Sequence, residues 1–113
     1  MKVAATFWIV IDLGSLMPKL SKLRDYAYNR QDGKCWYCDC AMRPASDPSP
    51  RRCTAEHLHA RCDGGKDVPQ NIVAACWLCN NRRHRRKAPK TPEDYRNFVR
   101  ERVAQGRWIV FDA

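Results

Sequence analysis

The sequence has no long hydrophobic run, which argues against a membrane-spanning helix. Its most apolar stretch, residues 3–11, ends at Asp12 and is about half as long as the ~20 apolar residues that such a helix needs. Lys2 is the single basic residue before this stretch, and no clear cleavage site follows it, so it does not fit an export signal. Its β-branched and aromatic residues favour a buried strand. We therefore expect a cytoplasmic protein with no membrane partner.

Acidic residues are scarce beside basic ones. The chain has 12 Asp and Glu residues against 21 Lys and Arg residues, a formal charge of +9 and a pI of about 9.5. Such an excess favours a polyanionic partner, either nucleic acid or an acidic membrane surface. The charge is clustered in residues 82–87, which read RRHRRK. This clustering favours nucleic acid.

The chain also lacks internal repeats and low-complexity segments. With 113 residues there is little room for a second hydrophobic core, so we expect a single domain over residues 1–113. So short a chain buries a limited share of its surface, and a structural metal would offset part of that shortfall.

Cysteine, in contrast, is abundant, but the number is odd. A complete set of disulfides would leave one of the seven thiols over. Two C-x-x-C pairs predict instead a four-thiolate zinc site in a reducing compartment. Its predicted ligands are Cys35, Cys38, Cys76 and Cys79. Cys40 is the one rival ligand, while Cys53 and Cys62 have no assigned role.

Hydrophobic periodicity and turn residues predict a small α+β domain. We expect an N-terminal strand and helix within residues 3–31, a core over about 33–87, and a C-terminal helix and strand within 91–112. The N-terminal helix should follow Pro18, place Leu20, Leu23 and Ala27 on one face, and end at Asp32-Gly33. The C-terminal helix should start at Thr91, end at Gly106, and have an apolar face of Tyr95, Phe98, Val99 and Val103. Inside the core, strands are predicted at 54–58 and 71–75, with a helix from the second cysteine pair to about residue 86. The short terminal strands could pair with each other. Two strands and a helix between cysteine pairs are the layout of a zinc-stabilised, treble-clef-like ββα-metal module.

Over about residues 33–87 the sequence resembles the HNH endonuclease family. The fragments that carry the resemblance are Glu56-His57, Asp63-Gly64-Gly65, Asn71-Ile72-Val73 and Cys76-Trp77-Leu78-Cys79-Asn80. Each fragment is weak alone, but their order between the two cysteine pairs is specific.

The resemblance implies a role for each matching residue. His57 matches the general base that deprotonates a water molecule, and Glu56 matches the metal ligand before it. Asn71 matches the residue that holds the connecting loop and the base. Asn80 matches a second metal ligand, and His84 falls where some members have a third. The implied activity is metal-dependent hydrolysis of DNA that leaves a 5′ phosphate and a 3′ hydroxyl.

Two departures from the family pattern concern the same strand. The acidic ligand is Glu56 where Asp is commoner, and Ala60 stands where many members have proline. His59 is an additional histidine nearby.

The residues themselves are compatible with these implied roles. Asn80 and His84 are four positions apart and share one face of a helix. Glu56 and His57 point to opposite faces of a regular strand, so both can flank one site only if the strand is distorted. A carboxylate, an amide oxygen and an imidazole suit Mg²⁺ or Mn²⁺, and the imidazole also permits Ni²⁺ or Zn²⁺. No small-molecule cofactor is expected.

The basic residues near this site predict contacts to DNA phosphates, which position the duplex without reading its sequence. No dedicated base-reading element is visible. The predicted DNA contacts are Arg82, Arg83, Arg85, Arg86 and Lys87, with Arg61 and Lys66 in the connecting loop.

Two other classes of function remain open at this point. One is a zinc-stabilised module that binds nucleic acid without catalysis, and the other is a protein-interaction zinc module. The oligomeric state, the sequence preference and the biological role cannot be read from the sequence.

Overall fold

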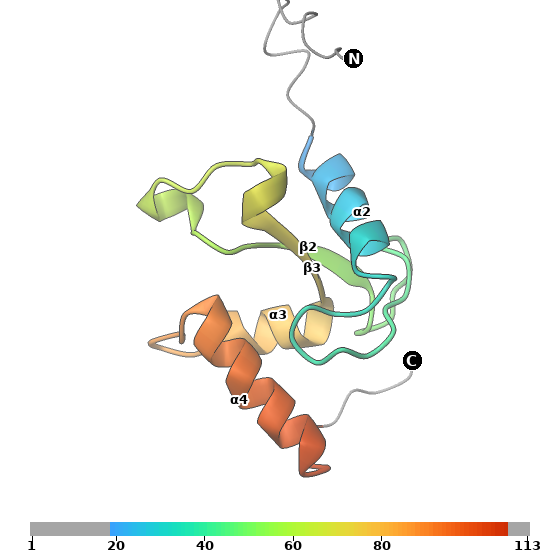
Figure 1. Cartoon of the computed structure of the whole chain (residues 1–113), viewed down its shortest axis with the longest axis vertical. Coiled ribbons are helices and arrows are strands. Elements are labelled where there is room, and N and C mark those ends of the chain that lie inside the picture. Colours follow the sequence, from blue (N-terminus) through green and yellow to red (C-terminus); the bar gives the residue numbers. More distant parts are fainter. Residues whose placement is uncertain (1–18, 109–113) are drawn as a thin grey trace, which may run out of the picture.

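The computed structural model describes residues 19–108. The predicted strands near both ends of the chain therefore lie outside the described residues. At the centre is an antiparallel hairpin of β2 (Cys53–His57) and β3 (Ile72–Cys76), in the register Glu56 opposite Val73 and His57 opposite Ile72. In Figure 1, α2 (Leu20–Arg30) and α3 (Trp77–His84) lie on opposite sides of this hairpin, and α4 (Pro92–Ala104) lies against α3. The predicted α+β class with a ββα core is confirmed.

Helix α2 begins and ends near the predicted positions. Leu23 and Ala27, four residues apart and hence on one helix face, are its buried residues. The chain then turns at Asp32 and Gly33, both with positive φ (55° and 72°). Glycine tolerates this conformation without steric cost. The turn directs the chain into the first cysteine pair.

Helix α4 has the predicted start and stop. The Thr91 side chain accepts a hydrogen bond from the Asp94 backbone N–H at 3.2 Å, which caps the helix. Gly106, at φ +69°, follows the C-cap. Tyr95 and Val99 are fully buried against the core, whereas Val103, predicted on the same face, is 36% exposed. The last turn of α4 extends beyond the core.

The bounds of the core elements differ slightly from the prediction. Helix α3 ends at His84 instead of Arg86. Two short 3₁₀ turns, Arg61–Asp63 and Pro69–Asn71, replace the plain loop, so Asn71 precedes β3 and is not part of it.

Among residues 19–108, no helix is long and apolar enough to cross a membrane.

Candidate functional site

The four cysteines of the two C-x-x-C pairs form one buried cluster. Their sulfur atoms all lie within 4.8 Å of one another. One pair follows α2 and the other spans the junction of β3 and α3, so the hairpin brings together residues 41 positions apart. Backbone N–H groups of Tyr37 and Cys76 donate to Cys35 Sγ, both at 3.3 Å. Cys40 is not in this cluster; its thiol donates to the Cys38 carbonyl at 3.7 Å.

The packing of four sulfurs into one buried space suits a cation. Hydrogen bonds with Cys35, Cys38 and Cys76, together with burial, raise the pKa of Cys79 far above the usual range of a thiol. Four thiolates cannot share so small a volume without a positive charge. Zinc supplies that charge and binds four sulfur ligands in a tetrahedral arrangement. The cluster therefore fits a structural zinc ion.

Helix α4 closes the first cysteine pair from outside. Arg96 Nε donates to the Trp36 carbonyl at 2.9 Å, and Arg100 Nε donates to the Tyr37 carbonyl at 2.8 Å. The Tyr37 ring packs edge-on against Tyr95, with centroids 5.3 Å apart. These contacts satisfy the carbonyls of the turn and bury it, so the cluster is a closed, structural site.

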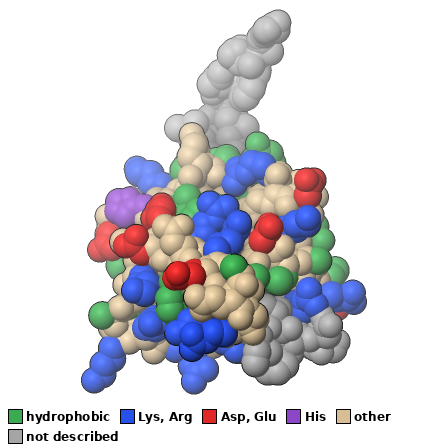
Figure 2. Space-filling view, turned by 60° about the horizontal axis from the view of Figure 1, so that its bottom comes forward, with side chains coloured by type: hydrophobic (Ala, Val, Ile, Leu, Met, Phe, Trp, Pro, Cys, Tyr) green, Lys and Arg blue, Asp and Glu red, His purple; other side chains and the backbone are tan. Residues whose placement is uncertain are grey.

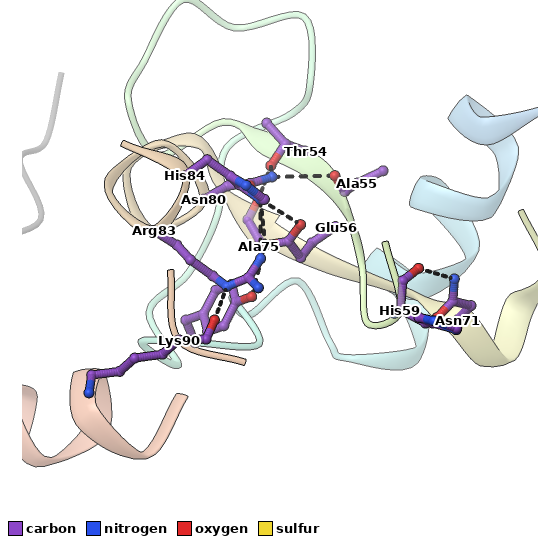
Figure 3. Close-up of polar contacts among 11 residues, drawn as sticks. Thr54, Ala55, Glu56, His59, Asn71, Ala75, Asn80, Arg83, His84 and Lys90 are labelled. Atoms are coloured by element: carbon purple, nitrogen blue, oxygen red, sulfur yellow. Dashed lines mark hydrogen bonds and ion pairs between the residues drawn. The ribbon is translucent and has the colours of Figure 1, made fainter. Parts of the chain in front are cut away.

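A second group of polar residues lies between β2 and α3. Glu56 is 4% exposed, and its carboxylate faces α3, not solvent. Tyr37 donates to Oε2 at 2.8 Å and Arg83 Nη1 donates to the same oxygen at 3.2 Å. His84 Nε2 lies 3.0 Å from Oε1. Glu56 and His84, both predicted ligands, are therefore brought together (Figure 3).

Asn80 is held in one orientation beside them. Its Nδ2 donates to Thr54 Oγ1 at 3.0 Å and to the Ala55 carbonyl at 3.3 Å. The Thr54 hydroxyl uses its own proton on the Ala75 carbonyl at 2.7 Å, so toward Asn80 it can only accept. This fixes the amide with its nitrogen toward β2 and leaves the amide oxygen available to a cation.

His57 points to the other side of β2, toward the connecting loop. Its Nε2 lies 2.7 Å from Asp67 Oδ1. Arg61 also pairs with Asp67, with Nε 3.0 Å from Oδ1 and Nη2 against Oδ2. Hydrogen bonds from Arg61 and then from His57 lower the pKa of Asp67 to about 2. Asp67 is therefore a carboxylate at neutral pH, and His57 Nδ1 is left for other partners.

Asn71 ties the two ends of the connecting loop together. Its Oδ1 accepts from the His59 N–H at 2.7 Å, and its Nδ2 donates to the carbonyls of His59 and Lys66 at 2.9 and 3.0 Å. A Cβ at Gly65 would lie 1.8 Å from the His59 carbonyl oxygen. The loop closes only because residue 65 has no side chain.

The polar residues between β2 and α3 line one cleft of about 700 Å³. Glu56, His57, Asn80, Arg83 and His84 all contribute to its walls. Glu56 and His57 thus border the same space, although they leave β2 on opposite sides. The cleft closes around Glu56 at its base and opens at His84, whose side chain is 54% exposed.

The basic run separates into three groups. Arg83 points inward to Glu56 and donates to the Lys90 carbonyl at 2.9 Å. Arg82 and Arg86 lie over aromatic rings packed against α4: Arg82 is 4.8 Å from the Trp108 ring centroid and Arg86 is 5.1 Å from that of Phe98. Arg85 and Lys87 are exposed. Figure 2 shows Lys and Arg side chains over much of the lower part of one face, with Asp and Glu in smaller separate patches.

Sequence reasoning missed Tyr37, Thr54 and Asp67, each of which touches a predicted site residue. Only Thr54 carried a usable signal, since it lies two positions before Glu56 and hence on the same side of β2. Tyr37 and Asp67 meet their partners only through the packing of the cysteine turn and the loop.

Comparison with known proteins identifies one family. The family model described as HNH endonuclease matches residues 35–86. None of the curated proteins matches the sequence significantly.

Proposed function

We propose that the chain is a metal-dependent endonuclease that hydrolyses DNA phosphodiester bonds, because the HNH endonuclease family model matches residues 35–86. The observation that carries the proposal is the cleft in which Glu56, Asn80 and His84 converge beside His57. A carboxylate, an amide oxygen and an imidazole are a donor set that Mg²⁺ or Mn²⁺ accepts, and Ni²⁺ or Zn²⁺ is compatible with it.

Each residue of the cleft then has a defined task. Glu56, Asn80 and His84 would hold the divalent cation, which would stabilise charge on the phosphate and on the departing 3′ oxygen. His57 accepts a proton at Nδ1 from the attacking water, because Asp67 holds Nε2 at 2.7 Å. Asn71 keeps the loop closed behind the base through its three hydrogen bonds.

DNA is the proposed partner, bound through its phosphates. Arg85, Lys87 and Lys66 are exposed around the cleft-bearing helix and loop, where they can neutralise phosphate charge without reading bases. Arg61 is exposed but already pairs with Asp67, and Arg83 is occupied by Glu56. We therefore assign phosphate binding first to Arg85, Lys87 and Lys66.

The zinc cluster is assigned to the scaffold. We propose a reducing compartment, the cytoplasm, because the two C-x-x-C pairs converge on a cluster that fits zinc. Residues 1–113 are proposed to form one domain around this cluster.

The test is conversion of supercoiled plasmid by purified protein with EDTA, Mg²⁺, Mn²⁺ or Ni²⁺. We expect nicking or linearisation that requires the cation and that falls about 10²–10⁴-fold in His57→Ala, the range for loss of a general base. His59→Ala is the matched control, because His59 holds Asn71 through its backbone and not through its ring.

One observation favours the alternative, a zinc-stabilised module that binds nucleic acid without cutting it. Glu56 is buried and already paired with Arg83, as a purely structural carboxylate would be. DNA binding without cleavage under every cation would support this alternative. Cleavage by His57→Ala at the parent rate would instead show that another group is the base.

A further inference from the structure

Tyr37 connects the cysteine cluster to the cleft. It lies between Cys35 and Cys38 in the first C-x-x-C turn, and its hydroxyl donates to Glu56 Oε2 at 2.8 Å. The two residues are 19 positions apart and both are buried, with exposed fractions of 0% and 4%. The family resemblance gives a role to Glu56 but none to Tyr37, so it does not account for this contact.

The tyrosine acts as a neutral hydrogen-bond donor. Its hydroxyl lies 2.8 Å from Oε2 of Glu56, and a carboxylate oxygen can only accept a hydrogen bond. The hydroxyl proton of Tyr37 is therefore directed at Oε2. A buried donor to a carboxylate is a strong, directional contact.

The contact distinguishes the two oxygens of Glu56. Oε2 accepts from both Tyr37 and Arg83, at 2.8 and 3.2 Å. His84 Nε2 lies 3.0 Å from Oε1 and 3.2 Å from Oε2, so Tyr37 and Arg83 are the contacts that distinguish Oε2 from Oε1. With Oε2 occupied, Oε1 is the oxygen that Glu56 can offer on the side where His84 lies.

The position of the hydroxyl is set by the cysteine turn. The Tyr37 N–H donates to Cys35 Sγ at 3.3 Å, and its carbonyl accepts from Arg100. The ring is fixed between Trp36 and Tyr95, each with its centroid 5.3 Å away and nearly perpendicular. A shift of the turn would therefore move the donor that orients Glu56.

We propose that Tyr37 is a positioning residue for the catalytic cation site: it holds Oε2 of Glu56 so that Oε1 is presented to the cation beside His84. The inference rests on the proposed function, because it assumes that Glu56 binds the cation. The first C-x-x-C turn would then have two roles, because it supplies two zinc ligands and also orients a ligand of the second metal.

The test compares Tyr37→Phe with Tyr95→Phe. Both changes remove only a hydroxyl, and the two rings pack against each other, so Tyr95→Phe reproduces the effect of losing a buried-ring hydroxyl without touching Glu56. The measurements are zinc per chain, thermal unfolding, the dissociation constant for Mn²⁺ by calorimetry, and plasmid cleavage as a function of Mn²⁺ concentration.

Tyr37→Phe should keep one zinc per chain and bind Mn²⁺ about 10–100-fold more weakly, the usual effect of removing a partner of a metal ligand. Cleavage should recover at high Mn²⁺. Tyr95→Phe should bind Mn²⁺ like the parent. A merely structural role would lower stability in Tyr37→Phe without shifting the Mn²⁺ dependence, and that result would overturn the inference.

Failure of the inference is distinct from failure of the proposed function. If the parent cleaves DNA and Tyr37→Phe binds Mn²⁺ as tightly, the inference is wrong and the nuclease assignment stands. If the parent protein neither binds Mn²⁺ nor cleaves, the proposed function is wrong and the inference falls with it.

Discussion

The cysteine cluster and the cleft beside Glu56 both use residues of the β2–β3 hairpin and α3, but they differ in ligand chemistry and in access to solvent. The cluster has four identical soft ligands, all nearly inaccessible to solvent, and its surroundings leave no open position. The cleft has three chemically different donors and about 700 Å³ of open space. Structural metal sites are closed and catalytic ones keep a position free. The difference indicates that one site holds the fold and the other is accessible to substrate.

The two sites also differ in how their residues are held. The cluster fits a zinc ion, because four sulfurs within 4.8 Å of one another need a cation among them. In the cleft, neighbouring side chains hold each donor: Tyr37 and Arg83 bind Glu56, and Thr54 binds Asn80. We therefore expect changes in the cluster to destroy the fold and changes in the cleft to spare it.

The largest effect is expected from Cys79→Ser. Zinc binding supplies on the order of 10–16 kcal/mol in small zinc domains, comparable to or above the ~5–15 kcal/mol stability of a typical domain. The variant should lose zinc and its cooperative thermal transition. Elemental analysis and circular dichroism measure both. Cys62→Ser, at an exposed cysteine outside the cluster, is the control and should keep one zinc.

A folded Cys79→Ser variant with parental thermal stability and no zinc would contradict the scaffold role of the cluster. It would also remove the main distinction between the two sites.

His84→Ala should affect only the cleft. Because the His84 side chain is 54% exposed, we expect zinc content and stability to change little, as is usual for surface changes. Affinity for a divalent cation should fall, more for Ni²⁺ than for Mn²⁺, because imidazole nitrogen favours nickel. Calorimetric titration with both ions is the measurement, and equal affinities in parent and variant would make His84 a bystander.

Asp67→Asn should slow catalysis without weakening cation binding. The carboxylate holds His57 Nε2, and the neutral amide would hold it more weakly. The loss should lie below the roughly 10²–10⁴-fold cost of removing a general base. Single-turnover cleavage at saturating cation measures it, with Asp63→Asn as the control, because Asp63 is an exposed carboxyl of the same loop that borders the cleft and does not hold His57.

The charge of Asp67 in the parent protein should not change near neutral pH. The pKa of Asp67 is lowered from 3.8 to about 2, so the charge is fully present above about pH 4 and is lost only as the pH falls through about 2. An NMR titration of the Asp67 carboxyl in the parent protein should therefore show no ionisation above about pH 4. Ionisation of Asp67 above that pH would mean that the carboxyl is not held as the structure describes.

Thr54→Val should have the smallest effect. It keeps the shape of the side chain but removes the hydroxyl that holds Asn80 Nδ2, a hydrogen bond that contributes about 0.5–1.5 kcal/mol. Mn²⁺ affinity should fall slightly, and Thr54→Ser should restore it. If Thr54→Val binds Mn²⁺ as the parent does, Asn80 does not depend on Thr54 for its orientation.

The sequence predicted the parts of the fold that depend on local pattern. The cysteine spacing, the Leu23/Ala27 face of α2 and the Thr91 cap are all local signals, and each is found as expected. Placing Asn71 within a strand and extending α3 to Arg86 were wrong, because local propensity does not determine where a loop tightens into a 3₁₀ turn.

Much of what orients the site could not be predicted. The contact of Tyr37 with Glu56 depends on how deeply the cysteine turn packs against β2, and the inward turn of Arg83 depends on the phase of α3. The basic run resembles one uniform surface in sequence, but helical geometry turns Arg82 and Arg86 toward α4 and Arg83 toward Glu56. The roles of His57, Glu56, Asn80 and His84 in catalysis and cation binding stay predictions that the experiments above address.

The central claim is that two metals occupy two separate sites. Its most direct test is a crystal structure of the protein soaked in Mn²⁺, with anomalous scattering recorded at the zinc and manganese edges. The account predicts zinc among Cys35, Cys38, Cys76 and Cys79, and manganese bound by Glu56 Oε1, Asn80 and His84. Manganese absent from the cleft, or bound only elsewhere while zinc fills the cluster, would contradict it.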